Sequence, residues 1–365
     1  MNMGQTSKVR IAVVGLGFGS SFAKIYKDHP DVEYVGLCEI NETKLHEIGD
    51  ALGIERRHTS LDEVIASDAY DAVHLLTPIP LHAQQSLAIL NSGKHCACAV
   101  PMGTTLEELQ AIVDASRTNQ RNYMMMETAV YTYYFLMVKE MVERGEFGRI
   151  QFLRGAHYQD MENWPAYWSG LPPMHYATHA VSPLLAISKS RATKVHCFGS
   201  GYMRDELKQK HGNPYPIESA IFQLDDGLLS AEVTRTLFHT ARGGLESFNV
   251  YGEETSFEWH LHNESPILFK KKEQPPGAWG LQFEPHPVSE KPDFRHLLPE
   301  QIAHHVNGGH HGSHPYLVHE FISSIVEKRN PWIDAVTSAN WTAAGICAHQ
   351  SAMNGGAEMI IPSFR

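Results

Sequence analysis

The stretch that decides the fold is residues 9–20, which read VRIAVVGLGFGS. The aliphatic run Val9–Val14 predicts a buried strand, and a helical pattern continues from the glycines to about Asp28. The turn residues that we expect to contact a cofactor are Gly15, Gly17, Phe18, Gly19 and Ser20. A glycine-rich turn between a strand and a helix is typical of dinucleotide binding, because it lets a pyrophosphate approach the backbone and the helix N-terminus.

A second cofactor signal ends the next predicted strand, Val32–Glu39. A carboxylate at the position of Glu39 holds the ribose hydroxyls of NAD and repels the additional phosphate of NADP. Residues 40–42 contain no arginine that could accept such a phosphate. The sequence therefore predicts tightly bound NAD, and the alternative is a tight strand–helix turn without a ligand.

Strands and helices alternate over residues 1–128. The expected strands are 9–14, 32–39, 72–76, 95–99 and 123–127, and the longer expected helices are 41–52, 81–92 and 105–119. Such alternation implies a parallel sheet with right-handed crossovers, which makes the fold class α/β. We expect residues 1–128 to form a Rossmann-type dinucleotide-binding domain.

The pattern changes after residue 128, where strand-like segments predominate. The expected strands are 150–158, 194–201, 220–224, 228–237, 247–252 and 256–261, with a long excursion over 270–299 and helices over 315–328 and 338–354. We expect residues 129–365 to form an α/β domain with a largely antiparallel open sheet. The open face of such a sheet commonly binds substrate or a second subunit.

Composition excludes several classes of function. Hydrophobic residues make up 42% of the 365 residues and the net charge is −11, so neither nucleic acid nor an anionic membrane is an expected partner. No apolar run is long enough to cross a bilayer, and the N-terminus has no apolar signal core, so a cytoplasmic location is expected.

Residues 93–105, GKHCACAVPMGTT, resemble the second signature of the Gfo/Idh/MocA family, the glucose–fructose oxidoreductase and inositol dehydrogenase group. That signature normally ends a strand with Glu-Lys-Pro, whereas this chain has Ala99, Val100 and Pro101. In the family the lysine helps to take the proton from the substrate hydroxyl as hydride leaves its carbon. Because Val100 has no group that accepts a proton, another base must serve here. The resemblance also implies a homodimer or homotetramer.

The same resemblance extends to the residues around the nicotinamide. Thr77, Pro78 and His82 match a Thr-Pro-x-x-x-His segment that lines this side of the cofactor in the family. The further positions that we assign to the cofactor site are Ala99, Val100, Pro101 and Glu127. For His82 the competing interpretation is a helix residue with no ligand role.

Three segments resemble one branch of the family, the NAD-dependent exo-α-N-acetylgalactosaminidases and related glycosidases. They are residues 124–131 with Glu127 and Tyr131, residues 175–183 with a Tyr-x-Thr-His core, and residues 308–312 with a Gly-Gly-His motif. That branch also replaces the family lysine by valine, but it keeps the glutamate where this chain has Ala99. The resemblance thus implies glycoside cleavage without fixing the reaction.

Tyr176 and His179 are three residues apart, a spacing that brings both side chains to one face of a helical turn. His179 is the candidate base at the hydroxyl that loses hydride, since histidine titrates near neutrality. Tyr131 or Tyr176 is the candidate for removing a proton from the adjacent carbon, which requires neighbours that lower the tyrosine pKa. Simple packing is the alternative for each aromatic residue.

Five further residues are candidates for substrate binding: Trp164, Trp168, His175, Arg235 and His311. The tryptophans suit stacking on sugar rings or a hydrophobic plug under the loop. Arg235 suits an anionic substituent, and the alternative is an exposed or ion-paired strand residue. A late cluster contains His304, His305, His310, His311 and His314. We interpret this cluster as a polar loop and predict no metal.

Three functions stay open. The first is redox-assisted glycoside hydrolysis, in which NAD oxidises a ring hydroxyl, the neighbouring C–H is deprotonated, the anomeric group is eliminated, water adds and the ketone is reduced again. The second is a plain NAD-dependent sugar or cyclitol dehydrogenase with His179 as base. The third is a non-catalytic paralogue, which the loss of the signature glutamate and lysine would fit.

Overall fold

The computed structural model describes residues 8–225, 227–242, 244–259, 265–273, 275, 277, 279–280 and 282–365. It divides the chain into two compact units. Unit 1 comprises Met1–Tyr131, Phe294–Ala339 and Phe364–Arg365, and unit 2 comprises Thr132–Asp293 and Asn340–Ser363. Within the described residues, no helix combines the length and the apolar character that a membrane crossing requires.

Unit 1 is built on a six-stranded parallel sheet with the order β3-β2-β1-β4-β5-β6. Its strands are β1 Val9–Val14, β2 Val32–Cys38, β3 Arg57–His58, β4 Ala72–Leu75, β5 His95–Cys98 and β6 Tyr123–Met125. This order is the doubly wound arrangement of dinucleotide-binding domains, and it confirms the predicted fold class. The central strands β1 and β4 are almost fully buried because helices cover a parallel sheet on both faces.

Several helices of unit 1 begin at a residue whose side chain caps them. Its helices are α1 Leu16–Asp28, α2 Glu42–Leu52, α3 Leu61–Ala66, α4 His82–Asn91, α5 Leu106–Asn119, α9 Glu300–Ala303 and α10 His314–Val326, with short turns η1 Ile79–Leu81, η2 Thr128–Tyr131, η5 Arg295–Leu297, η6 His304–Asn307 and η7 His310–Gly312. Ser60 caps α3, and Thr105 with Glu108 forms a capping box on α5.

Residues 294–339 pack with unit 1, whereas the sequence predicted a single boundary at residue 128. The amide of Met125 on β6 donates to the carbonyl of Ile333 at 3.3 Å, and Asn122 donates to Ser324 at 2.9 Å. Helix α10 buries Leu317 and Phe321 completely. An apolar helix far along the chain cannot be assigned to a domain by position alone, because burial decides where it packs.

Unit 2 contains a nine-stranded sheet with the order β14-β13-β12-β11-β7-β10-β9-β8-β15. The strands are β7 Ile150–Tyr158, β8 Ala192–Ser200, β9 Ile217–Leu224, β10 Ser230–Thr236, β11 Leu245–Gly252, β12 Thr255–Glu258, β13 Ile267–Lys271, β14 Phe283–Pro287 and β15 Met359–Ile360. Only the β7–β10 pair is parallel among these described strands, so the sheet is largely antiparallel as predicted. Part of the predicted strand 256–261 lies outside the described residues.

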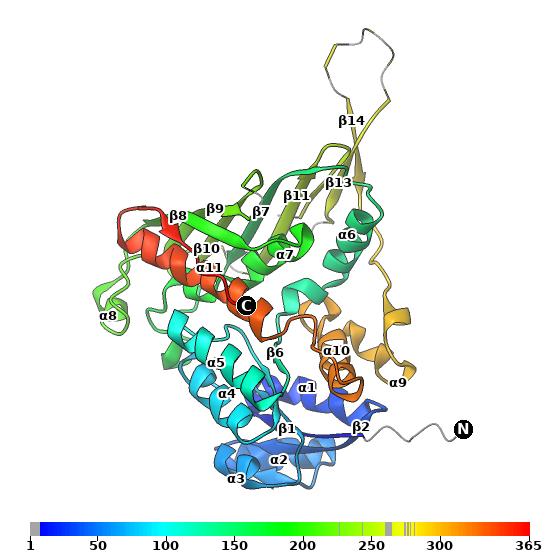
Figure 1. The fold of residues 1–365 in the computed structure, drawn as a ribbon, viewed down its shortest axis with the longest axis vertical. Helices are drawn as coiled ribbons and strands as arrows, with labels where there is room; N and C mark the ends of the chain where they lie inside the picture. Colours follow the sequence, from blue (N-terminus) through cyan, green and yellow to red (C-terminus); the bar gives the residue numbers. More distant parts are fainter. Residues whose placement is uncertain are drawn as a thin grey trace. The chain divides into compact units, whose positions relative to one another are not determined.

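The helices of unit 2 cover one face of this sheet, and buried residues alternate with more exposed ones along the described strands β7, β9 and β10. These helices are α6 Tyr133–Glu143, α7 Thr178–Ser188, α8 Asp205–Lys208 and most of α11 Ala335–Met353, with turns η3 Ala166–Trp168 and η4 Pro173–Tyr176. Helix α7 lies across β7, β10 and β11 (Figure 1). The approach is close because Gly155 has no side chain: a Cβ there would lie 2.1 Å from the carbonyl oxygen of Ala180.

Candidate functional site

The glycine turn of unit 1 has the open backbone that a pyrophosphate requires. Gly15 has φ 89°, and a Cβ there would lie 2.5 Å from the carbonyl oxygen of Leu76. A Cβ on Gly17 would have space, with the Lys44 Nζ as its nearest neighbour at 3.5 Å. Helix α1 begins here without a side-chain cap and without an acidic residue in its first turn. The turn therefore fits a bound phosphate group.

Glu39 lies directly after β2 and points its carboxylate toward the same turn. Its oxygens accept from the Leu16 amide at 3.0 Å, the Lys44 Nζ at 3.1 Å and the Asn41 amide at 3.3 Å. Partial burial alone would raise the pKa of Glu39, but these donors outweigh it and lower the pKa. The group is thus ionised at neutral pH, as the interaction with ribose hydroxyls requires.

We expect Glu39→Gln to weaken NAD binding by about 10- to 100-fold, the loss that follows from removing a charged hydrogen-bond acceptor. NADP binding should improve at the same time, because the repulsion disappears and the Lys44 Nζ is released from its 3.1 Å ion pair. Titration calorimetry with both cofactors measures the change. Glu42→Gln, an exposed glutamate in the first turn of α2, is the matched control. Unchanged NAD affinity in the Glu39 variant would contradict the assignment.

His82 joins the two loops that follow β4 and β5. Its Nδ1 lies 2.8 Å from the carbonyl oxygen of Pro101, and its Nε2 lies 2.7 Å from that of Thr77. Both contacts need an N–H donor, so the geometry requires the imidazolium form. Burial by itself would lower the pKa of His82, but Cys98 and the two carbonyl groups outweigh it and raise the pKa to about 9. His82 therefore holds the predicted nicotinamide loops in place.

This arrangement predicts a pH-dependent stability. Because the folded pKa of His82 lies above its ordinary value of 6.5, the stabilisation is fully present below pH 6.5 and is lost as pH rises through about 9. Linkage gives about 3 kcal/mol over that window. Urea unfolding at pH 6.5 and 9.5 should show a smaller difference for His82→Gln than for the unchanged chain. Equal differences in both proteins would refute the imidazolium assignment.

The segment that replaces the family's Glu-Lys-Pro offers no proton acceptor. Ala99 is half-buried, and Val100 and Pro101 are buried. Nearby, Glu127 is fully buried and accepts from the Ala129 amide at 3.0 Å. Burial, and then the charge of Glu320, raises the pKa of Tyr131 well above its ordinary value. A tyrosine acts as a base only where its neighbours lower its pKa, so Tyr131 does not meet this requirement.

In unit 2, four aromatic side chains bring the predicted catalytic pair together. The Tyr176 hydroxyl lies 3.3 Å from the His179 Nε2, and their rings meet edge to face at 5.3 Å. Trp168 meets the Tyr176 ring at 4.8 Å, and His157 on β7 meets the His179 ring at 5.1 Å. Trp168 is 6% exposed, and its indole N–H has no hydrogen-bond partner among the described residues. These residues form the Tyr176–His179 cluster.

Arg235 on β10 hydrogen-bonds to the backbone of this cluster, and it is fully buried. Its guanidinium donates to the Tyr176 carbonyl at 2.7 Å, the His157 carbonyl at 3.0 Å and the Gln159 Oε1 at 2.7 Å, and it also contacts the Thr236 carbonyl. The predicted role in binding an anionic substituent is wrong for this conformation, because the donors are directed at internal acceptors. The strand pattern could not show that the side chain points into the core.

Sequence reasoning missed a buried pair that anchors the turn before Tyr176. Glu218 on β9 is fully buried; it accepts from the Met174 amide at 2.8 Å and lies 2.6 Å from the His349 Nδ1 on α11. A Cβ on Gly345 would lie 2.1 Å from the Met174 carbonyl oxygen, so α11 also packs against this turn. Nothing in the local sequence distinguishes Glu218 from an ordinary strand residue.

The remaining predicted substrate residues lie in different settings. Trp164 is 56% exposed and meets Trp168 at 6.3 Å, so it is available to a ligand. His175 packs edge-on against His349 at 4.9 Å, and burial followed by the charges of neighbouring histidines lowers its pKa to about 3. His311 is exposed on η7 of unit 1 with φ 50°. His310 meets the Phe18 ring, which is 43% exposed, at 5.5 Å.

Together, the parallel sheet, the open glycine turn and the carboxylate after β2 fit an NAD-binding Rossmann domain. Residues 9–127 match the Gfo/Idh/MocA family model, described as an oxidoreductase family with an NAD-binding Rossmann fold. The match covers all six strands of the parallel sheet, so this part of the chain is similar to the Gfo/Idh/MocA oxidoreductase family.

Two relatives carry the name glycosyl hydrolase family 109 protein. The one from Saccharopolyspora erythraea is 23% identical over 98% of this chain and 83% of its own length. The one from Porphyromonas gingivalis is 26% identical, and the match spans 48% of this chain and 42% of that protein. The alignments with several such relatives thus span less than half of their length.

Solved structures share the fold at lower identity. A levoglucosan dehydrogenase in complex with NADH and levoglucosan has a TM-score of 0.80 at 18% identity, over 98% of this chain and 100% of that one. The scyllo-inositol dehydrogenase of Lactobacillus casei has a TM-score of 0.72 at 18% identity, over 97% and 99%. The two-unit fold is therefore that of known NAD-binding proteins.

Proposed function

We propose that this protein is an NAD-dependent enzyme that cleaves glycosides by a redox-assisted route. The observation that carries the proposal is the hydrogen-bonded Tyr176–His179 pair, 3.3 Å apart in unit 2, in a chain whose Val100 replaces the usual lysine. The names of the glycosyl hydrolase relatives support glycoside cleavage. When bound, NAD would supply a hydride acceptor for a ring carbon and return the hydride at the end of the cycle.

Each residue of the pair has one proposed task. His179 takes the proton of the hydroxyl whose carbon loses hydride, and it returns that proton when the ketone is reduced. Tyr176 takes the proton from the neighbouring carbon, which the ketone has acidified, while the anomeric group leaves. Water then adds across the double bond, so the net reaction is hydrolysis. Arg235 supports the Tyr176 role, because a cation 5.3 Å from the ring favours a phenolate.

The surroundings of the pair support a sugar as substrate. Exposed Trp164 offers an aromatic face for the apolar C–H side of a pyranose ring. The Trp168 indole N–H, buried and without a partner among the described residues, could donate to a sugar hydroxyl. A carbohydrate satisfies both requirements, since it combines apolar faces with many hydroxyl acceptors.

A plain sugar or cyclitol dehydrogenase is the second candidate. The solved levoglucosan and scyllo-inositol dehydrogenases have the same fold, and His179 could act as base in either reaction. In that case NADH would accumulate, and Tyr176 would orient His179 instead of removing a carbon-bound proton. The non-catalytic paralogue is the least supported, because its hydrogen-bonded Tyr–His pair would have no task.

The experiment is turnover on a panel of aryl glycosides, with phenol release and NADH absorbance followed together and no cofactor added. The glycosidase proposal predicts many phenols per chain without net NADH. NADH that accumulates from free sugars once NAD is supplied, without phenol release, would establish the dehydrogenase. If neither phenol release nor NADH accumulation is seen, and the chain does not bind NAD, the protein is a non-catalytic paralogue.

We also propose that the open sheet face of unit 2 pairs with a second copy, giving a homodimer or homotetramer. Ile221 on β9 and Phe198 on β8 are 48% and 63% exposed, and Phe152 stacks on Tyr251 on neighbouring strands. An apolar sheet face of this kind is typical of a subunit interface. Sedimentation should give a mass above one chain, and Phe198→Glu should reduce it.

A further inference from the structure

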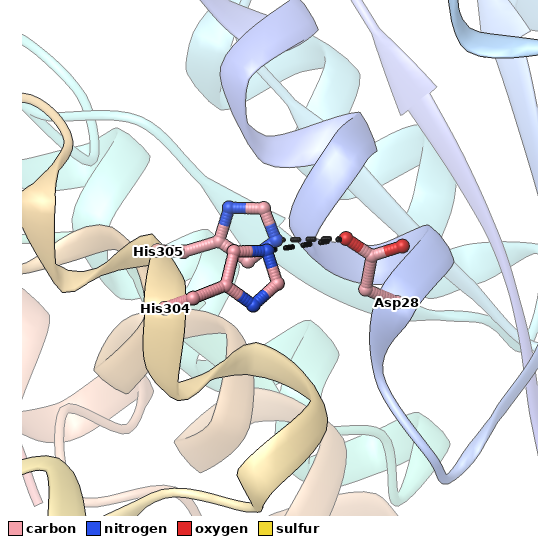
Figure 2. A group of neighbouring side chains, drawn as sticks. All are labelled: Asp28, His304 and His305. Carbon is pink, nitrogen blue, oxygen red and sulfur yellow. Dashed lines mark hydrogen bonds and ion pairs between the residues drawn. The ribbon is translucent and has the colours of Figure 1, made fainter.

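A group of three metal-ligating side chains lies in unit 1, outside the glycine turn and outside the Tyr176–His179 cluster. Asp28 is the last residue of α1, and His304 and His305 open η6. Both elements belong to unit 1, and α1 contacts the neighbouring helix α9. Figure 2 shows both imidazole rings directed at the Asp28 carboxylate.

The distances suit a shared ion. The Asp28 Oδ2 lies 2.9 Å from the His305 Nε2 and 3.8 Å from the His304 Nε2. The three residues offer ligand atoms that all lie within 4.8 Å of one another. Ligands about 2.0–2.1 Å from a tetrahedral zinc ion lie about 3.3 Å apart, which falls between the two measured distances. Small side-chain rotations would therefore place all three atoms around one ion.

We propose that Asp28, His304 and His305 bind a divalent cation of the zinc type. Two imidazoles and one carboxylate are ligands that zinc, cobalt and nickel accept, whereas magnesium and calcium prefer oxygen alone. The His304 side chain is 61% exposed and the Asp28 side chain 35%, so water can complete the coordination. The proposal departs from the sequence expectation of no metal.

Some charges around the three residues favour a bound cation, and others disfavour it. Asp28 ends α1, where the helix dipole disfavours a carboxylate, so a cation here would remove an unfavourable interaction. Lys24, one turn earlier on α1, is exposed and close enough to His305 to repel a cation. The Asp28 charge offsets that of Lys24, and the ion's own charge is stabilised mainly by coordination.

The bound ion would fix the position of the loop between η6 and η7. The His305 carbonyl accepts from the Gly308 amide at 3.0 Å, and Gly308 begins the Gly-Gly-His motif that carries His310 and His311. Fixing His304 and His305 on α1 therefore fixes the start of this loop. The role is structural and does not depend on the proposed glycosidase reaction.

The test uses the full chain, freed of metal with a chelator and titrated with zinc chloride. We expect one zinc ion per chain by calorimetry and by metal analysis after gel filtration, and a higher Tm with zinc. Asp28→Asn and His305→Gln should each weaken binding at least about tenfold, because even residues that only orient a metal ligand contribute about 10- to 100-fold to affinity. His296→Gln, an exposed histidine on η5, is the control and should bind as before.

Two results would overturn the site. One is no stoichiometric zinc in the unchanged chain, and the other is undiminished binding in the Asp28→Asn/His305→Gln double variant. Cobalt gives a second measurement that needs no variant. Its spectrum should show nitrogen and oxygen coordination, whereas a thiolate charge-transfer band would assign the ion to one of the five cysteines, which are buried.

Discussion

His179→Asn should lower kcat by about 10²- to 10⁴-fold, the range for loss of a positioned general base. The reason is that the variant cannot take the hydroxyl proton, and no group in the segment Ala99–Pro101 can replace it. NAD affinity should stay within about twofold, because the glycine turn and Glu39 hold the cofactor. Steady-state kinetics on the best aryl glycoside and calorimetry with NAD make the measurement.

The control for this variant is His196→Asn, on a histidine whose side chain is 54% exposed on β8. It should keep normal turnover. Tyr176→Phe retains the aromatic packing but loses the hydroxyl 3.3 Å from the His179 Nε2, so its kcat should also fall. If His179→Asn kept turnover within about threefold of the unchanged chain, His179 would not be the base.

The largest expected loss of stability is that of Glu218→Ala, about 2–6 kcal/mol, because two buried donors are left without an acceptor. The substitution leaves the His349 Nδ1 and the Met174 amide without the acceptor that lies 2.6 Å and 2.8 Å away. Because Met174 belongs to the same turn η4 as Tyr176, catalysis should fall as well. Urea unfolding monitored by tryptophan fluorescence measures the stability.

Glu143→Ala is the control for Glu218. It removes an exposed glutamate at the end of α6, where the carboxylate pairs with Lys139 at 3.5 Å. Such surface pairs contribute at most about 1 kcal/mol. Equal destabilisation by the two substitutions would show that the buried pair does not anchor the turn.

The sequence predicted most of unit 1 because local signals decide its elements. The glycine turn, Glu39 after β2 and the capping residues Ser60 and Thr105 each act within a few residues of the element that they specify. The strand β7 was predicted with its observed bounds, 150–158, since its side chains alternate between the two faces of the sheet.

The parts that sequence reasoning missed depend on contacts between distant segments. His157 reaches His179 only because β7 packs beneath α7, and Glu218 reaches His349 across 131 residues of chain. Arg235 looked like a ligand for an anion, but internal carbonyl groups use its donors. The proposed metal site at His304 and His305 likewise requires Asp28. Sequence periodicity shows only that Asp28 ends a helix, not that it lies beside these histidines.

The most direct test of the central claim compares phenol release by the chain stripped of NAD and by the chain reloaded with it. Rapid mixing of the reloaded chain with an aryl glycoside should give a rise of NADH absorbance, then phenol release, then a fall of NADH absorbance as the ketone is reduced. The stripped chain should show no turnover. Phenol release at the same rate from the stripped chain would contradict a redox-assisted mechanism.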